Sequence, residues 1–223
     1  MGILKKLGRA RRRLTGHDGN FLSAAEAYRH LAVQLHFDLM SNANGQARGC
    51  CLMLTCPDSR DQTEQATRML AAFLAEEQEH NVLIIDGGFA GNTLSAQFQA
   101  PRSPGLLNIL DGSEPDVQNV VRTTGHPNIF FLPTGESQFG PRKLLMSPSF
   151  THTLDQFRSR YDFSLIGTGS VLEDSSALAV PSVVDCVLLL IIEGVTRWPT
   201  VNACRCAMEN CKARRIEPIL GSR

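Results

Sequence analysis

The chain has 223 residues and a formal net charge of zero, with 22 lysines and arginines against 22 aspartates and glutamates. This length is enough for one α/β domain with a full core, and the balanced charge gives no indication of a nucleic-acid partner. No apolar run approaches the roughly 20 residues of a membrane span, and the basic first residues do not fit a secretory signal. We therefore expect a cytoplasmic protein.

The N-terminal segment carries a local excess of positive charge. Residues 1–20 hold basic side chains against a single acid, Asp18. The basic residues are Lys5, Lys6, Arg9, Arg11, Arg12 and Arg13. Two interpretations remain open: a flexible tail, or an arm that contacts an anionic membrane surface or an acidic partner. In the second case Arg11, Arg12 and Arg13 are the candidate contact residues.

A first helix is predicted over Ser23–Met40. Ser23 can cap its start, and Glu26 completes a capping box. Apolar residues at helical spacing mark the face that we expect to be buried. They are Tyr28, Leu31, Ala32, Leu35 and Leu39.

The next stretch has the order strand, loop, helix, strand. An apolar run at Cys50–Leu54 enters a polar loop, Thr55–Asp61, and a second apolar run, Val82–Ile85, ends on Asp86. The helix between them is indicated by apolar residues on one face, namely Ala66, Met69, Leu70, Phe73 and Leu74. This is a βαβ unit whose loop lies where a parallel sheet commonly binds a phosphate.

The loop lacks the residues that phosphate binding requires. Such a loop uses glycines for the tight bend, a lysine for charge and a hydroxyl for magnesium. Here glycine and lysine are absent, and the acids Asp58, Asp61 and Glu64 occur instead. With Asp86, the acids Asp61 and Glu64 could form a cation pocket, but we favour a solvated loop beside one remaining carboxylate.

The remaining elements complete an alternating pattern after a flexible stretch that we expect between Gly87 and Pro104. Helices are predicted at 105–110, 116–122, 144–157 and 200–214, and strands at 129–132, 163–166, 187–192 and 217–220. Most strands are near-continuous apolar runs, which is typical of a parallel sheet covered on both faces. The predicted fold is a single α/β domain over residues 21–223, with a mainly parallel twisted sheet, helices on both faces and P-loop NTPase-like topology.

The cysteines and histidines do not indicate a metal site. Cys204, Cys206 and Cys211 have the spacing C-x-C-x4-C, which matches none of the familiar zinc patterns. We interpret all seven cysteines as reduced thiols, mostly in the core. His80, His126 and His152 show no pairing by spacing and are interpreted as surface residues.

Several landmarks, from about Ala25 to Leu220, together resemble a known family. They are EAYR at 26–29, VLIID at 82–86, GLLNIL at 105–110, LPTG at 132–135, PRKLL at 141–145, Ser147-Pro148 and YDF at 161–163. In their order and spacing they resemble the bacterial tyrosine autokinases. These are cytoplasmic partners of membrane co-polymerases in capsule and exopolysaccharide synthesis, within the deviant-Walker ATPase group of MinD and ParA.

The departures from that family all fall on its chemistry. Thr63 stands where the resemblance implies the phosphate lysine, and Glu64 where it implies the magnesium hydroxyl. Asp86 is retained, but Gly88 replaces the second acid of that motif, and Gly167 replaces the Walker B aspartate. The resemblance therefore implies that ATP and magnesium binding are lost, so we expect no cofactor and no catalytic residue.

The resemblance also implies a surface for assembly. In the family an E-x-x-R-x-x-R pattern on the first helix pairs with a neighbouring subunit, and Glu26 and Arg29 match its first two positions. Ala32 occupies the third, which leaves a homo-oligomer and a plain intrahelical pair as alternatives. The tyrosine cluster that such kinases phosphorylate has no counterpart, since the chain contains two tyrosines, Tyr28 and Tyr161.

Three hypotheses of function follow. The first is a non-catalytic structural or regulatory subunit of an exopolysaccharide or capsule synthesis and export complex, docking on a co-polymerase at the inner face of the cell membrane. The second is an active kinase with a non-standard site that uses Asp86 and Asp61. The third is a positioning factor similar to MinD or ParA.

Overall fold

The computed structural model describes residues 24–42, 49–57, 60–76, 79–89, 91, 94–114 and 116–221. Within the first helix it describes the side chains of residues 26–37, and within the second those from residue 62 onward. The basic segment with Arg11, Arg12 and Arg13, the Ser23 cap and Asp58 lie outside the described residues. Asp61 is described in its backbone alone.

The described part of the chain forms one seven-stranded sheet with the order β3-β4-β2-β5-β1-β6-β7. The strands are β1 Cys50–Thr55, β2 Val82–Gly87, β3 Arg122–Thr123, β4 Ile129–Leu132, β5 Phe163–Thr168, β6 Cys186–Ile192 and β7 Ile216–Gly221. All neighbours pair in parallel except β3 and β4, which are antiparallel. The predicted fold class is confirmed.

The central strands are buried because both faces of the sheet are covered. Every residue of β2, β5 and β6 is buried, as is all of β1 after Cys50. This is why these segments are near-continuous apolar runs in the sequence, since a strand with two buried faces has no position for solvated side chains. The strands were therefore the most predictable elements of the chain.

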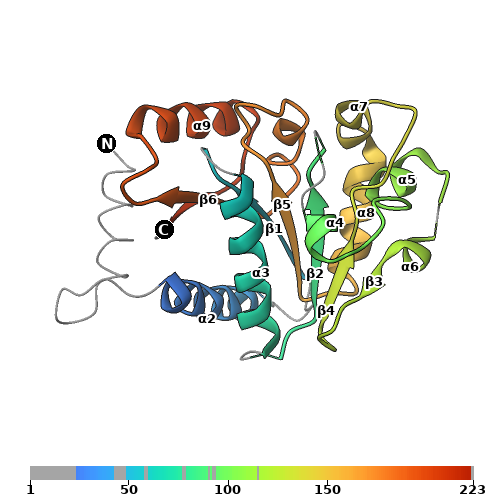
Figure 1. The fold of residues 1–223 in the computed structure, drawn as a ribbon, viewed down its shortest axis with the longest axis horizontal. Coiled ribbons are helices and arrows are strands. Elements are labelled where there is room, and N and C mark those ends of the chain that lie inside the picture. The colour runs from blue at the N-terminus through green and yellow to red at the C-terminus, as the bar shows by residue number, and fades with distance from the viewer. Residues whose placement is uncertain are drawn as a thin grey trace.

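Helices cover both faces of the sheet, and the sheet separates the hydrophobic core into two clusters (Figure 1). One face carries α2 Ala24–Asn42, α3 Arg60–Glu76 and the short α4 Leu94–Gln97. The other carries α5 Leu106–Asp111, α6 Val117–Val120, α7 Pro141–Leu145, α8 Pro148–Arg158 and α9 Trp198–Asn210. On the first face, α2 packs against α3 and reaches β7.

Several predicted boundaries were wrong, each for a local reason. The helix expected at 116–122 ends at Val120, because Arg122 and Thr123 extend to pair with β4. The helical region at 144–157 is two helices, since Pro148 starts a new one at its first turn. The stretch from Gly87 to Pro104 contains α4.

The seven cysteines are not joined in disulfides. Within the described residues no group of three or more histidine, cysteine, aspartate or glutamate side chains could hold a metal ion. None of the described helices combines the length and the hydropathy needed to cross a bilayer.

Candidate functional site

The predicted site lies at the carboxyl ends of β1, β2 and β5, where the chain leaves β1 and enters α3. The sheet register places Gly167 of β5 between Leu54 of β1 and Asp86 of β2. Ligands of open parallel sheets bind at this edge, because the loops that follow the strands converge there. The sequence therefore brings Asp86, Gly167 and the start of α3 together as expected.

Asp86 is fully buried and its carboxylate is used inside the protein. One carboxylate oxygen accepts the backbone N–H of Gly88 at 3.0 Å. The other accepts the backbone N–H of Ser95 at 2.9 Å and its hydroxyl at 2.6 Å. The exposed fraction of Asp86 is 0%, so the carboxylate that remains beside the loop lies inside the protein. Asp86 instead fixes the start of α4 over the end of β2.

A side chain at Gly167 would be tightly packed against its neighbours. A Cβ atom built there would lie 3.0 Å from Cδ1 of Leu94 and 3.0 Å from the hydroxyl oxygen of Thr67. Leu94 and Thr67 are both 0% exposed, and the Thr67 hydroxyl donates to the carbonyl of Thr63 at 2.7 Å. The position that the resemblance assigns to a carboxylate is thus enclosed by a leucine and a threonine.

Thr63 and Glu64 lie on the first turns of α3 and are both buried, with exposed fractions of 1% and 7%. The side-chain amide of Gln97, the last residue of α4, donates to the carboxylate of Glu64. The carbonyl oxygen of the same amide accepts from a guanidinium nitrogen of Arg68 at 2.6 Å. Glu64 and Asp86 therefore contact opposite ends of α4, at Gln97 and Ser95.

The loops after the strands are also fixed by buried hydroxyls. Thr55 donates to the carbonyl of Gly169 at 2.8 Å, and Thr168 donates to that of Leu54 at 3.2 Å. Thr134 donates to the backbone carbonyl of Asp86 at 2.9 Å. These bonds hold the carboxyl ends of β1, β2, β4 and β5 in one rigid arrangement.

The sequence did not reveal the part that α4 plays. Leu94, Ser95 and Gln97 each contact a different predicted site residue, but they fall in a stretch that was expected to be flexible. A helix of four residues is too short to show a helical period. The one available signal was the apolar Leu94 within a polar segment.

The predicted assembly residues lie on the exposed side of α2. Glu26 and Arg29 are exposed, and the Arg29 guanidinium lies 5.0 Å from the centre of the Phe73 ring of α3. Ala32 is buried, with an exposed fraction of 1%. Arg29 thus contributes to the packing of α2 on α3, while contact with another subunit stays a prediction.

The histidines differ from expectation at one position. His126 is half-buried and His152 is exposed, but His80 is buried, with an exposed fraction of 5%. Its Nε2 lies 2.8 Å from Nδ1 of His36, and its Nδ1 lies 3.6 Å from a carboxylate oxygen of Asp162. The surface interpretation of His80 was wrong because its partner His36 is far away in the sequence.

The two tyrosines are part of the fold. Tyr28 is 5% exposed, and burial raises its pKa to about 12. Tyr161 is half-buried, its pKa is also raised by burial, and its ring lies 5.3 Å from that of Phe130. Buried hydroxyls such as that of Tyr28 are poor acceptors for a phosphoryl group, because the reacting oxygen has to leave the core.

Comparison with known proteins finds relatives that are named as tyrosine-protein kinases. The putative tyrosine-protein kinase EpsB of Ralstonia solanacearum is 32% identical over 156 residues, which is 69% of this chain and 20% of that protein. The tyrosine-protein kinase wzc of Salmonella typhi is 31% identical over 157 residues, 70% of this chain and 21% of that protein. The chain thus spans about a fifth of the length of the curated relatives it matches. No protein-family model matches the sequence.

The solved structures that resemble this chain also include bacterial tyrosine kinase domains. The kinase domain of Escherichia coli tyrosine kinase ETK has a TM-score of 0.77 and 25% identity, covering 89% of this chain and 75% of that one. The VpsO kinase domain has a TM-score of 0.74 and 26% identity, covering 90% and 94%. The MinD cell division protein of Aquifex aeolicus, at 15% identity over 77% of this chain and 69% of its own, has a TM-score of 0.60 and shows the fold alone.

The fold is that of the P-loop ATPases, with the sheet edge and the βαβ unit in the places where that class holds nucleotide. Within this class the chain belongs to the family of the bacterial tyrosine-protein kinase domains, as its relatives in sequence and in structure indicate.

Proposed function

We propose that this chain is a non-catalytic member of the tyrosine-kinase family that acts as a structural or regulatory subunit in exopolysaccharide or capsule synthesis and export. One observation carries the proposal. Leu94 and Thr67 fill the space beside Gly167 where a metal-orienting carboxylate would project, and Leu94 belongs to the helix that Asp86 and Glu64 fix in place. The closed edge supports a role other than phosphoryl transfer.

Charge supports the same proposal. Phosphoryl transfer needs cations around the phosphates, usually a lysine and magnesium. Thr63 brings no charge to the first turn of α3, and Glu64 brings a carboxylate. Two like charges about 4 Å apart repel by about 4 kcal/mol at an effective dielectric of about 20. A polyphosphate at this turn would meet repulsion instead of neutralisation.

The proposed work of the chain is protein contact. We place the docking surface on α2 and the basic N-terminal segment, and the partner is the cytoplasmic part of a membrane co-polymerase. Glu26 and Arg29 are exposed on α2, and Phe37 on the same helix is 64% exposed. Arg11, Arg12 and Arg13 would add attraction to an anionic membrane surface or an acidic partner. Association with the inner face of the membrane and formation of a homo-oligomer are parts of this proposal.

Calorimetric titration with ATP and magnesium is the direct test of lost nucleotide binding. We expect no heat of binding up to millimolar nucleotide, while the E. coli ETK kinase domain serves as the positive control. Binding at micromolar concentration that disappears in Asp86→Asn would overturn the proposal, because it would show that the retained acid still serves a nucleotide site. Asparagine is chosen because it keeps the shape and part of the hydrogen bonding of the buried carboxylate.

Docking is tested separately by sedimentation with vesicles that contain a co-polymerase from a polysaccharide system. We expect binding that is reduced by a combined Arg11→Gln, Arg12→Gln and Arg13→Gln variant and by Phe37→Ser. A variant at Arg142, an exposed residue of α7 on the opposite face of the sheet, is the matched control. Equal binding by all variants would refute the assignment of this surface.

No observation favours the two alternative functions. An active kinase would use Asp86 and Asp61, but Asp86 is committed to Gly88 and Ser95. Similarity to MinD extends to the fold, at 15% identity.

A further inference from the structure

A cavity of about 990 Å³ lies away from the candidate site, beside the middle of α3. Its walls are α3, the loop that follows α4 and the hairpin of β3 and β4. Ile129, the first residue of β4, lines it, so the cavity is near the amino end of this strand. The candidate site follows the carboxyl ends of the strands, and the two regions are therefore distinct.

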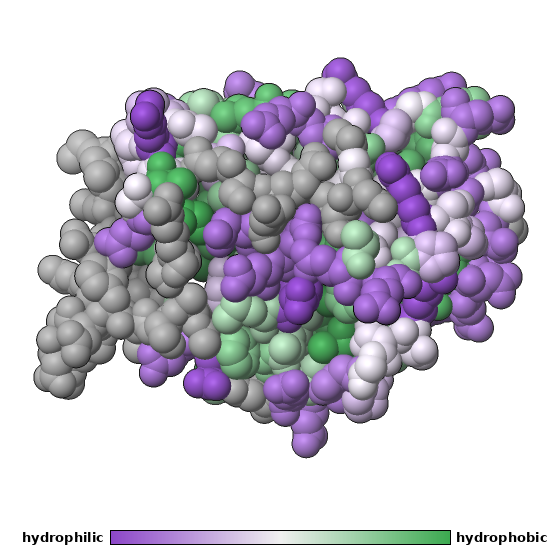
Figure 2. Space-filling model, in the orientation of Figure 1, coloured by the Kyte–Doolittle hydropathy of each residue, from purple (hydrophilic) through white to green (hydrophobic). Residues whose placement is uncertain are grey.

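The floor of the cavity is apolar and partly aromatic. Phe98 and Phe131 stack with ring centres 4.5 Å apart and an interplanar angle of 23°. Met69 and Ile129 extend the apolar surface on either side. Figure 2 shows this apolar patch on the molecular surface between α3 and the hairpin, with hydrophilic residues around it. A flat apolar ring fits against such a floor.

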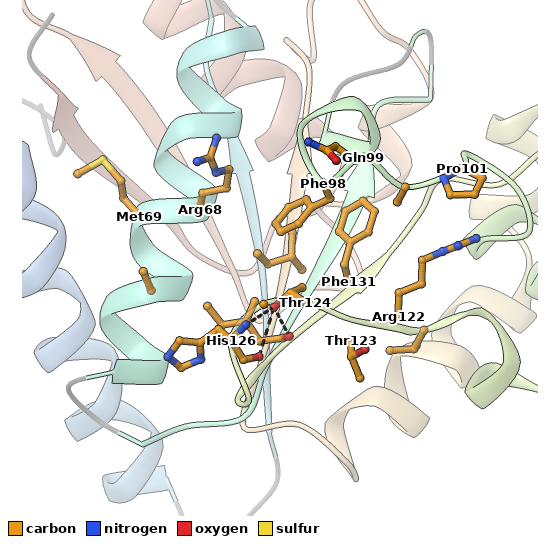
Figure 3. Close-up of a pocket in the computed structure, with 16 residues that line it drawn as sticks. Arg68, Met69, Phe98, Gln99, Pro101, Arg122, Thr123, Thr124, His126 and Phe131 are labelled. Carbon is orange, nitrogen blue, oxygen red and sulfur yellow. Dashed lines mark hydrogen bonds between the residues drawn. The ribbon is translucent and has the colours of Figure 1, made fainter.

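The charged groups of the cavity are two arginines, and uncharged polar side chains lie beside them. Arg68, Arg122 and His126 line it, and none of the described lining residues carries a carboxylate. Figure 3 shows Arg68 on α3 and Arg122 on the hairpin at opposite sides of the Phe98–Phe131 pair. The carboxylate of Glu76, outside the lining, lies 4.0 Å from Nε2 of His126. The cavity therefore favours a ligand with negative charge.

Arg122 indicates where a ligand could bind in the cavity. Its Nε–H is buried and finds no acceptor among the described residues. A buried donor on a charged group is unfavourable without an acceptor, and such groups are rare in folded proteins unless a water or a ligand completes them. Arg68, in contrast, already donates to Gln97. The Nε atoms of Arg102 and Arg205 also lack an acceptor in the described part of the chain, but Arg122 is the one of these three arginines that lines the cavity.

From the floor, the charge and this donor we infer that the cavity binds a small organic anion with a flat apolar ring system, its acidic group on Arg122 and its rings on Phe98. The volume is at the upper end of the roughly 300–1000 Å³ of small-molecule sites, so it suits two or more rings. The positive charge of residues 1–20 has the same sign as that of the cavity, which favours a separate anionic ligand as the occupant. This inference does not depend on the proposed function.

A matched pair of fluorescent probes tests the inference. One is 8-anilinonaphthalene-1-sulfonate, an aromatic anion, and the other is N-phenyl-1-naphthylamine, which has the same rings without the sulfonate. We expect one saturable site for the anion and binding at least about tenfold weaker for the neutral probe, since a hydrogen bond to a charged group accounts for at least that factor. Inorganic sulfate alone should compete weakly. Equal affinities of the two probes would overturn the assignment to Arg122.

Three variants locate the site. Arg122→Gln should weaken binding of the anilinonaphthalene sulfonate about tenfold or more. Arg142→Gln, at an exposed residue of α7, should leave the affinity unchanged. Ala72→Phe places a ring in the cavity from α3 and should abolish binding even if Arg122→Gln does not fold. Unchanged affinity in both Arg122→Gln and Ala72→Phe would refute the inference.

Amide chemical shifts give an independent readout. Thr123 and Gly125 line the cavity, and their backbone resonances should move on titration with the anion, while that of Gly140 should not. Shifts confined to the surroundings of Phe37 or Trp198, which are 64% and 45% exposed, would show binding to exposed apolar side chains and would contradict the proposal.

Discussion

Two regions of this α/β fold differ in how their polar groups are satisfied. At the carboxyl edge of the sheet, Asp86 accepts hydrogen bonds from Gly88 and Ser95, and Glu64 accepts one from Gln97. Beside the hairpin, the Nε–H of Arg122 has no acceptor among the described residues. At the edge of a P-loop ATPase fold that usually receives a ligand, these two acids are thus bonded within the protein, while a second region has positive charge and an unmet donor.

The comparison shows how much one short helix contributes at the carboxyl edge. The likeness to the kinase domains covers the fold as a whole. Within this fold, the described contacts of α4 reach Asp86, Gly167 and Glu64. Because the chemistry of a site can vary on a constant fold, the side chains around α4 are where this edge should be tested.

The largest effect is expected for Asp86→Ala. This change removes the acceptor for two backbone N–H groups and one hydroxyl at a position with 0% exposure. Each unsatisfied buried donor costs about 1–3 kcal/mol, so the free energy of unfolding should fall by about 3–5 kcal/mol. Urea denaturation measures the change as a lower midpoint at an unchanged slope.

The control for this prediction is Asp116→Ala, which removes an exposed N-cap carboxylate that accepts from Gln118 at 2.9 Å. Its cost should be about 1 kcal/mol. A similar small cost for Asp86→Ala would mean that the carboxylate does not hold α4, and the view of a closed edge would fail.

The second prediction is that Gly167→Asp destabilises the fold instead of restoring a metal site. The new Cβ would lie 3.0 Å from Leu94 and from Thr67, and its carboxylate would be buried beside Asp86. Overpacking costs about 1–3 kcal/mol, and an unpaired charge adds to this, so a loss of about 2–4 kcal/mol is expected in thermal or urea denaturation.

Gly140→Asp is the matched control, because no atom lies within 4 Å of a Cβ built at Gly140. Gly140 is also the N-cap of α7, where aspartate is favourable. If Gly167→Asp proves as harmless as Gly140→Asp, the space beside Gly167 is larger than the packing indicates.

The third prediction concerns pH and the contact between α2 and the sheet. Burial lowers the pKa of His80 below its ordinary value of 6.5, and the neighbouring His36 lowers it further, while Asp162 acts in the opposite direction. The unfolded chain therefore binds the proton more readily than the folded one. The contribution of His80 is fully present above pH 6.5 and is lost as pH falls from that value through the folded-state pKa.

Urea midpoints measured between about pH 8 and about pH 5 should show this loss. His80→Gln should flatten the profile in that window, whereas His152→Gln, at an exposed residue of α8, should leave its shape unchanged. A profile that is the same in all three proteins would contradict a role for His80 in the pH response.

The smallest effect is expected for Gln97→Ala. It removes the amide that donates to Glu64 and accepts from Arg68. Since Glu64 has further contacts and Gln97 is exposed, we expect a loss of about 1 kcal/mol by urea denaturation. Gln99→Ala, another exposed glutamine near α4, should change the stability by less than about 0.5 kcal/mol.

The elements that depend on a local sequence pattern could be predicted from the sequence. The buried runs of β2, β5 and β6 identified the parallel sheet, and the resemblance assigned Thr63, Glu64 and Gly167 to segments that the structure forms as α3 and β5. The boundary errors at Arg122 and Pro148 arose where two or three residues decide between helix and strand, which is too few for a period to show.

Contacts between segments that are distant in the sequence could not be predicted from it. His80 was misassigned because the 44 positions that separate it from His36 carry no sign that the two rings meet. The burial of Asp86 could not be predicted, because the residue that covers it, Ser95, belongs to a helix without a detectable period. The cavity could not be foreseen either, since its walls come from α3, the segment after α4 and the β3–β4 hairpin.

The contact of Leu94 with the space above Gly167 also links two positions that lie far apart in the sequence. A Cβ atom at position 167 would lie 3.0 Å from the leucine methyl group, so the two positions are not independent. Among homologous chains, a larger residue at position 167 is therefore expected together with a smaller residue at position 94.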